Sequence, residues 1–286
     1  MMKQFLFIIL FFFALTVFSQ NDADQYLSSN EKEYVNYSFK TNRVINLHSL
    51  ENTAHGVLDF KISHRFGPVN NGFYDLFGLD YATQRIGFDY GVTDRFCVGI
   101  NRNSVGKAFD GFLKYKIFRQ SKGEKAMPIT LIALTSAAHE TVKNGFSWKT
   151  RMFYTSQLII GRKFNDFLTL ELAPTHIRRN AVQTAAEKFD VFALGFGGRV
   201  RLSRRLTFNA EYCYVLPDQL APEFKNSLSV GLDIETGGHV FQLHFTNSTS
   251  MSEYGYFTQT TDSWTKSGIR FGFNVSRVFT LYDPKK

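Results

Sequence analysis

The chain has 286 residues, and its 33 lysines and arginines outweigh its 25 aspartates and glutamates to give a formal net charge of +8 at pH 7. This basic balance does not indicate a nucleic-acid-binding protein, because no run of Lys and Arg and no nucleic-acid motif accompanies it. Two cysteines, Cys97 and Cys213, are too few for a secreted fold stapled by disulfides, so we expect two sheltered free thiols. The 31 Phe and 13 Tyr are typical of membrane barrels, which use aromatic residues at both interfaces.

The first 19 residues have the pattern of a secretory signal peptide. Lys3 provides a positive charge, residues 5–17 are almost entirely apolar, and Ser19 ends a permissive cleavage site before Gln20. The apolar run is shorter than the roughly 20 residues that a membrane-spanning helix needs. No cysteine follows the cleavage site, so no lipoprotein signal is present. We therefore expect a cleaved signal peptide over 1–19 and export from the cytoplasm.

Residues 20–56 are polar and weakly patterned, and they predict a periplasmic segment that either plugs a barrel or leads into its first strand. From residue 57 on, apolar residues recur at every second position, with charged, small or hydroxyl residues between them. Each segment is close to the 9–11 residues of a tilted transmembrane strand. The predicted strands are 57–66, 83–92, 95–102, 110–118, 128–137, 150–161, 167–174, 190–202, 206–216, 227–235, 239–247 and 268–279. The segment 128–137 is more uniformly apolar than the others, so its facing stays open.

The connections between these strands alternate between short and long. Tight links at 93–94, 165–166, 203–205 and 236–237 fall between longer ones at 67–82, 138–148, 178–188, 217–226 and 247–267. Tight periplasmic turns and larger extracellular loops are typical of outer-membrane barrels. The links at 102–107 and 119–127 depart from this alternation. A soluble sandwich would also alternate, but its outward face would have to be well solvated. We predict an all-β fold: a transmembrane antiparallel up-and-down β-barrel of about 12 strands, outer-membrane type, over 57–282.

Several sequence blocks support this architecture by resemblance. They are FKTNRVINLHSLENTAHGVLDFKISHRFG (39–67), YDLFGLDYATQRIGFDYGVTDR (74–95), DGFLKYK (110–116), NSLSVGLDIETGGHVFQLHFTNS (226–248) and FGFNVSRVF (271–279). The chain resembles a family of bacterial β-barrel proteins that is known as a domain of unknown function and is taken to be outer-membrane. The resemblance implies the barrel and the outer membrane of a Gram-negative bacterium, and it implies no activity, ligand or catalytic residue.

If the apolar face meets lipid, the alternate positions face the lumen. Ten basic and seven acidic residues occupy them: Lys61, Arg65, Arg85, Arg95, Lys114, Lys116, Arg151, Arg199, Arg201, Arg270, Asp59, Asp89, Asp110, Glu171, Glu211, Asp233 and Glu235. One hypothesis is an internal network of ion pairs that fills the barrel, since confined charges must be paired or hydrated. The other is a narrow, porin-like channel for small solutes with a mild anion preference.

Evidence for chemistry in the sequence is weak. A barrel lipid hydrolase needs a nucleophile beside a histidine at the lipid face, and the nearest set is His244, Asn247 and Ser248. Strand parity places His244 in the lumen, on the wrong side for lipid. His48, Glu51 and His55 share a segment, but their spacing matches no established metal-binding pattern. We expect no enzyme activity, no catalytic residue, no metal and no cofactor.

A structural or partner-binding role is the alternative function. Besides the outer-membrane lipid, a partner protein has two candidate contact sites, the periplasmic segment 20–56 and the loop 247–267. The loop contains Tyr254, Tyr256, Phe257 and Trp264, which suit an exposed recognition surface. The opposing interpretation is a loop that packs over the barrel mouth. The glycines of GFGGR (195–199) lack a following helix and so form no phosphate-binding loop, and we expect them to let bulky neighbours pack inside the barrel or to relieve curvature.

Overall fold

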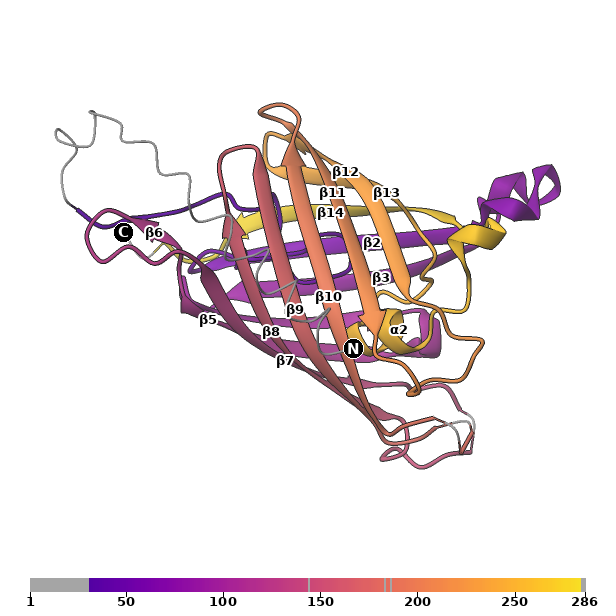
Figure 1. The fold of residues 1–286 in the computed structure, drawn as a ribbon. Coiled ribbons are helices and arrows are strands. Elements are labelled where there is room, and N and C mark those ends of the chain that lie inside the picture. Colours follow the sequence, from indigo (N-terminus) through magenta and orange to yellow (C-terminus); the bar gives the residue numbers. More distant parts are fainter. Residues whose placement is uncertain (1–30, 144, 183, 186, 284–286) are drawn as a thin grey trace, which may run out of the picture.

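The computed structural model describes residues 31–143, 145–182, 184–185 and 187–283. The predicted signal peptide, and residues 20–30 of the segment after it, lie outside these ranges. Within them, twelve strands close into one antiparallel barrel that follows chain order, which confirms the predicted fold class (Figure 1). The barrel strands are β2 (Val57–Pro68), β3 (Ala82–Gly91), β4 (Phe96–Asn103), β5 (Phe109–Phe118), β7 (Thr130–His139), β8 (Met152–Lys163), β9 (Leu168–Arg179), β10 (Asp190–Arg201), β11 (Leu206–Val215), β12 (Ser227–Thr236), β13 (His239–Thr246) and β14 (Arg270–Thr280).

The alternation in the sequence becomes the inside and the outside of the barrel. On β3, Phe88 points outward and is 44% exposed, whereas its neighbour Asp89 points inward and is 1% exposed. On β7, whose facing the sequence left open, Ile132 and Leu134 point inward. Pairing of β14 with β2 closes the sheet, so ladder hydrogen bonds can satisfy the strands' backbone groups without water.

The two ends of the barrel differ in their connections. Four tight turns, at 92–95, 164–167, 202–205 and 237–238, lie at what we call the short-turn end, on the left of Figure 1. The link between β5 and β7 is the long one there, because β6 (Ser121–Lys122) pairs with β1 (Glu33–Tyr34) in a small separate sheet. The opposite end, called the long-loop end, holds the short helices. They are η2 (Val69–Asn71), η3 (Phe73–Gly78), η4 (Val105–Lys107), α2 (Glu253–Thr258) and η5 (Trp264–Lys266).

Two segments occupy the lumen. Residues 37–55, which we call the lumenal hairpin, enter at the short-turn end, turn at 44–47 and return to the start of β2. The Val44 amide donates to the Leu47 carbonyl (2.8 Å) and the Ser49 amide to the Asn42 carbonyl (3.0 Å). From the long-loop end, the loop between β13 and β14 inserts α2. The hydrophobic core therefore lies inside the barrel, where the hairpin and α2 pack on its wall.

No helix among the described residues is long and apolar enough to cross a membrane.

Candidate functional site

Most of the charges predicted to face the lumen lie on its wall. Six basic and six acidic side chains are buried there: Lys61, Arg65, Arg85, Lys114, Lys116, Arg199, Asp59, Asp89, Asp110, Glu171, Glu211 and Asp233. Arg95 lies in a turn at the short-turn end and is exposed there, off the buried wall. Glu235 is also exposed at this end, but it pairs with Lys40 of the hairpin and lines a cavity between hairpin and barrel. Arg151, Arg201 and Arg270 are half-buried at the barrel ends. Arg179 of β9, which is not among the predicted residues, is also buried and pairs with Glu187 (2.6 Å). With this pair included, the buried charges are balanced, and the basic excess lies at the mouths.

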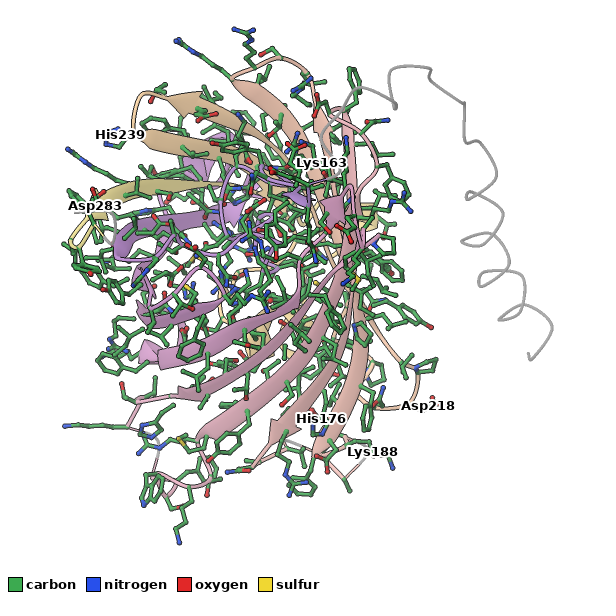
Figure 2. All side chains as sticks on the ribbon, turned by 90° about the vertical axis from the view of Figure 1, so that its left-hand side faces the viewer. Lys163, His176, Lys188, Asp218, His239 and Asp283 are labelled. Atoms are coloured by element: carbon green, nitrogen blue, oxygen red, sulfur yellow. The ribbon has the colours of Figure 1, made fainter. Side chains whose placement is uncertain are left out.

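Figure 2 shows how the ends frame this interior, with Lys163 and His239 near the short-turn end and His176 and Lys188 near the long-loop end. Between them, the inward faces of β2–β5 form what we call the charged wall. They contribute Lys61, Arg65, Arg85, Asp89 and Lys114, among others. The next strands around the barrel, β7–β10, form what we call the apolar wall. Its buried apolar side chains are Ile132, Leu134, Ala138, Phe153, Ile159, Ala173, Ile177, Val191 and Ala193. Polar and charged side chains such as Gln157, Glu171 and Arg199 are buried among them, so the apolar wall is the part of the lumen where apolar side chains are concentrated.

Glu211 on β11 holds the tip of the lumenal hairpin. Its carboxylate accepts hydrogen bonds from three successive backbone amides, those of Ile45 (3.1 Å), Asn46 (2.9 Å) and Leu47 (2.9 Å). The Asn46 side-chain amide donates to it as well (2.8 Å). Successive amides that converge on one oxyanion form a backbone nest. In this structure the nest binds a carboxylate of the barrel itself.

Apolar contacts hold the other side of the hairpin. Leu47 packs over Gly195, and a Cβ at that glycine would lie 3.0 Å from Leu47 Cδ2. Leu50 packs over Gly161, where a Cβ would lie 2.7 Å from Leu50 Cδ1. Glycine at these wall positions allows the hairpin side chains to approach the strands closely. Gly195 belongs to the GFGGR stretch, so at this glycine a bulky neighbour does pack inside the barrel.

The two inserted segments meet at Glu253, the first residue of α2. Glu253 Oε1 accepts from Arg43 Nη1 (2.6 Å) and lies 3.0 Å from His48 Nε2, and all three side chains are buried. Burial and the charge of Arg43 lower the pKa of His48 well below its usual value. Burial alone would raise the pKa of Glu253, but Arg43 and the hydrogen bond from His48 hold it well below its usual range. The junction therefore pairs a carboxylate with an arginine and a neutral histidine.

The loop 247–267 does not form the exposed recognition surface considered from the sequence. Tyr254, Tyr256 and Phe257 are buried inside the lumen, and Trp264 is half-buried. The Tyr254 ring stacks on Phe153 of β8 with centroids 4.1 Å apart, so it packs against the apolar wall. Exposing three aromatic rings to water would cost more than inserting them. The opposing interpretation, a loop that packs over the barrel mouth, agrees better with the structure. The loop also inserts below the mouth, into the lumen.

The alternative chemical sites are not assembled. The Ser248 hydroxyl donates to the Ser250 carbonyl (3.1 Å), and both ring nitrogens of His244 lack a partner among the described residues. His48 lies at the junction with α2, whereas Glu51 accepts from the Ser38 amide (2.6 Å). In the part of the chain that the structure describes, no group of three His, Cys, Asp or Glu side chains could hold a metal. Cys97 and Cys213 are free and buried, as predicted.

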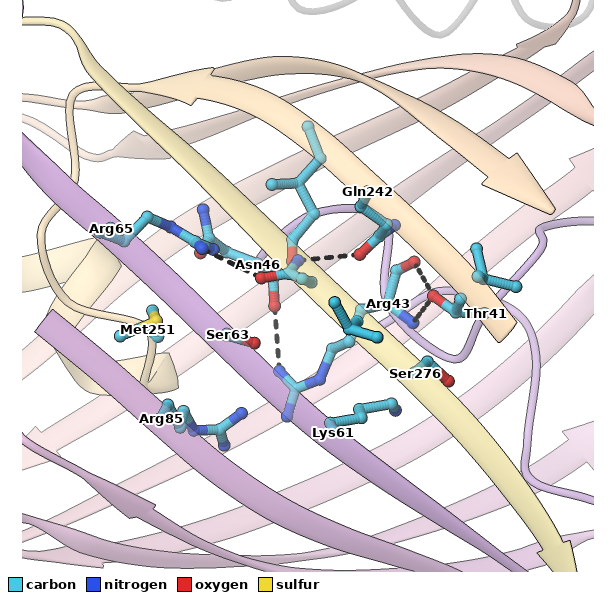
Figure 3. A pocket seen from close by; sticks show the side chains of 14 residues that line it. Thr41, Arg43, Asn46, Lys61, Ser63, Arg65, Arg85, Gln242, Met251 and Ser276 are labelled. Carbon is cyan, nitrogen blue, oxygen red and sulfur yellow. Dashed lines mark hydrogen bonds between the residues drawn. The ribbon is translucent and has the colours of Figure 1, made fainter. Parts of the chain in front are cut away.

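Two cavities lie in series between the hairpin and the barrel. The outer one, about 280 Å³ at the short-turn end, is lined by Lys40, Asp59, Glu235 and His239, among others. The inner one, about 20 Å³, lies deeper against β2, β3, β13 and β14 (Figure 3). Both are lined by Thr41, Val240 and Ser276, so these residues form the constriction between them. The cavities mark one polar strip of the wall along the hairpin.

Sequence reasoning missed Arg43 and Glu253. Both lie outside the strands, where period-two alternation assigns no facing. The only signal was the apolar residues of the otherwise polar N-terminal segment, namely Val44, Leu47 and Leu50. They indicate that this segment packs against something, but not which surface covers it.

Comparison with known proteins agrees with this architecture. Residues 39–279 match the family model described as "Membrane bound beta barrel domain (DUF5777)". The chain belongs to this family, and the protein is a membrane-bound β-barrel of outer-membrane type. No protein in the curated set matches its sequence.

Solved structures that align with most of this chain include an outer membrane channel and two porins. An outer membrane channel from Pseudomonas putida F1 has 12% identity over 81% of this chain and 98% of its own, with a TM-score of 0.50. The NanC porin has 9% identity over 78% and 98%, with a TM-score of 0.49. The KdgM porin has 10% identity over 78% and 99%, with a TM-score of 0.47. At these identities the likeness concerns the fold alone.

Proposed function

We propose that the protein is a gated channel for small polar solutes in the outer membrane of a Gram-negative bacterium, closed in this structure. The two cavities in series support this most directly. They follow one strip of wall, and the constriction between them is formed by Thr41 of the hairpin with Val240 and Ser276 of the barrel. A local shift of the hairpin away from β13 and β14 would join them without opening the sheet.

The proposed orientation follows from the ends of the barrel. In outer-membrane barrels the short turns face the periplasm and the long loops face outward. The lumenal hairpin would then close the channel from the periplasmic side, and α2 from outside. A cleaved signal peptide over 1–19 fits this route of export.

Polar atoms on the wall behind the hairpin also favour a gate. The Thr169 hydroxyl is buried without a hydrogen-bond partner among the described residues, and the buried Glu171 carboxylate has the backbone of Leu50 in the hairpin as a neighbour. Burying an unpaired hydroxyl or a carboxylate costs free energy, which hydration would recover. Withdrawal of the hairpin would let water reach them, and this offsets part of the cost of opening.

The charge distribution assigns selectivity to the mouths. The buried charges of the lumen are balanced, while Arg95, Arg151, Arg201 and Arg270 lie near the ends. The mild anion preference would therefore arise where solutes enter. The proposal gives the protein no catalytic role.

A reversible cross-link tests the gate. Asn46 Nδ2 lies 3.1 Å from Ser229 Oγ, so Asn46→Cys with Ser229→Cys, in a background where Cys97 and Cys213 are alanine, would tie the hairpin to β12. The matched control joins two wall strands through Gln157→Cys and Thr175→Cys, whose side chains lie 2.9 Å apart. Planar-bilayer currents are recorded before and after reduction, and mass spectrometry verifies each disulfide.

We expect the oxidised hairpin lock to abolish current and reduction to restore it, with no such change in the wall control. Current that persists through the oxidised lock would show that conduction does not need hairpin movement. Absence of current in both redox states would instead favour a non-conducting barrel subunit. Its partner site would then be the β1–β6 sheet, next to which Tyr37 is 80% exposed, rather than loop 247–267, whose aromatic side chains are mostly buried.

A further inference from the structure

The inner cavity has an unusual lining. Four cationic side chains surround it, Arg43 from the hairpin, Lys61 and Arg65 from β2 and Arg85 from β3 (Figure 3). Uncharged polar groups complete much of the lining, including Asn46, Ser63, Gln242 and Asn274. Among the described residues that line it, none is an aspartate or a glutamate. An enclosed space of this kind favours an anion.

Three of the four cations have carboxylate partners beyond the cavity lining. Arg43 pairs with Glu253 (2.6 Å), Lys61 with Asp89 (2.6 Å) and with Asp59 (3.2 Å), and Arg85 with Asp110 (2.5 Å). These pairs account for the charge of those three side chains.

Arg65 is different. It is 1% exposed and forms no ion pair among the described residues. Its guanidinium donates to the His64 carbonyl (2.8 Å), to Asn274 Oδ1 (3.0 Å) and to Asn46 Oδ1 (2.8 Å), all of them neutral acceptors. Glu211 attracts Arg65 by charge and is bridged to it by Asn46, but the two form no direct ion pair. A buried guanidinium without an adjacent carboxylate is costly, so a negative species in contact with it would be favourable.

Arg43 of the hairpin and Arg65 of β2 also have unused hydrogen-bond donors. Arg43 Nε, Arg43 Nη2 and Arg65 Nε are buried and have no hydrogen-bond partner among the described residues. A guanidinium can only donate, so a bound species must accept. Water could accept these bonds but would bring no negative charge into contact with Arg65, which Asn46 separates from the Glu211 carboxylate. An anion satisfies both the donors and the charge.

We propose that this cavity binds one monatomic anion of halide size, held between Arg43 of the lumenal hairpin and Arg65 of β2. About 20 Å³ is enough for one water-sized species, for which about 10–15 Å³ is the minimum, and too little for a phosphate or a carboxylic acid. The anion bridges the hairpin to the barrel wall and stabilises the docked hairpin. This inference concerns the docked state and does not depend on conduction.

Anomalous scattering from bromide tests the site in crystals of the full mature protein grown with bromide in place of chloride. We expect one bromide within hydrogen-bond distance of the Arg43 and Arg65 guanidinium groups. Arg65→Gln removes the charge and keeps the space, whereas Ser63→Val keeps every charge and fills the space. Both should lose the peak. Arg199→Gln is the matched control, since Arg199 also binds the hairpin, through the Tyr37 and Ser38 carbonyls, but does not line the cavity.

A solution measurement separates specific binding from binding at crystal concentration only. Bromide at about ten times its Kd should slow proteolysis of the hairpin about tenfold relative to gluconate at equal ionic strength, because it binds only the docked state. Ser63→Val should lose this protection. If Arg65→Gln does not fold, the proteolysis of Ser63→Val alone tests whether bromide binds in the cavity. A water without anomalous signal in the wild type, a bromide peak that survives in Ser63→Val, or equal protection by gluconate would each overturn the proposal.

Discussion

The charged wall and the apolar wall are neighbouring parts of one lumen, joined where β5 pairs with β7, and they hold the same hairpin by different forces. On the charged wall, carboxylates, arginines and lysines bond to hairpin backbone and side chains, as Lys114 does to the Ser49 carbonyl (2.8 Å). On the apolar wall, Leu47 and Leu50 fill the space above glycines. If the lumen were permanently filled with water, the side chains of Ile132 and Ile159, which are fully buried here, would be exposed at a cost in free energy. The apolar wall therefore favours a resting state in which the hairpin is docked. The charged wall favours a route for solutes beside the hairpin.

The largest effect should come from the apolar wall. Leu47→Ala removes a buried side chain that packs over Gly195, and large-to-small changes of this kind cost about 2–5 kcal/mol. The cost falls on docking of the hairpin, because the barrel ladder is untouched. Limited proteolysis in detergent should show faster cleavage within residues 37–55. Leu170→Ala, at a lipid-facing position that is 39% exposed, is the control and should leave cleavage unchanged. Equal cleavage of both variants would mean that the apolar wall does not hold the hairpin.

A somewhat smaller effect is expected on the polar side, at Glu211. Glu211→Gln removes the charge that three backbone amides of the hairpin tip bind, and hydrogen bonds to charged groups contribute about 1.5–3 kcal/mol. The same proteolysis assay should show intermediate cleavage. Glu235→Gln is the matched control, because the Lys40–Glu235 pair lies at the mouth with Glu235 half exposed, and such pairs contribute about 0–1 kcal/mol. A larger effect for Glu235→Gln than for Glu211→Gln would reverse the proposed ranking.

The junction between the hairpin and α2 predicts a dependence on pH. His48 and Glu253 both have lowered pKa values when docked, so release takes up protons. Docking is therefore fully stable above the pKa of the released histidine, about 6.5, and weakens as pH falls below it, by at most about 1.4 kcal/mol per unit from His48. Glu253 adds to this below about pH 4.5. The charged groups around His48 are Arg43, Glu253 and Lys114.

Channel current or hairpin cleavage, followed from pH 7.5 to 5.5 with buffers chosen around the reference pKa of histidine, about 6.5, measures this dependence. His48→Gln keeps a hydrogen-bond donor and removes the titration, so its profile should be flat over that interval. Increased docking at lower pH, or an unchanged slope in His48→Gln, would contradict the assignment.

The sequence predicted the barrel because β-strand alternation is a local signal. The facing of Phe88 and Asp89 follows from parity alone, and the balance between polar and apolar faces selects the membrane over water. Twelve strands long enough to cross a membrane, joined by alternating short and long links, then predict an up-and-down transmembrane barrel.

The contents of the lumen could not be predicted in the same way. Arg43 and Glu253 are 210 residues apart and lie in segments without periodicity, so nothing local indicates that they form an ion pair. The aromatic residues of 254–257 are compatible with an exposed surface until the apolar wall across from them is known. Parity also extends too far at one strand end, where Arg95 continues the pattern into the turn at 92–95. Long-range contacts, rather than local pattern, decide the site.

The smallest expected effect concerns the mouths. Arg95 and Arg201 lie at the short-turn end, and the Arg201 side chain is 39% exposed. Arg95→Glu with Arg201→Glu should lower the anion-to-cation permeability ratio, by less than about twofold at 0.15 M salt, because charges there are screened over about 8 Å. Reversal potentials under a salt gradient measure this ratio. Arg178→Glu is the control, since Arg178 pairs with Asp190 on the outer surface of the barrel and its charge is not at that mouth. If Arg178→Glu shifts the ratio as much as the pair does, the mouths do not set the preference. If the paired variant shifts it far more than twofold, the buried charges of the whole lumen are not balanced in the open state, and selectivity belongs to the lumen.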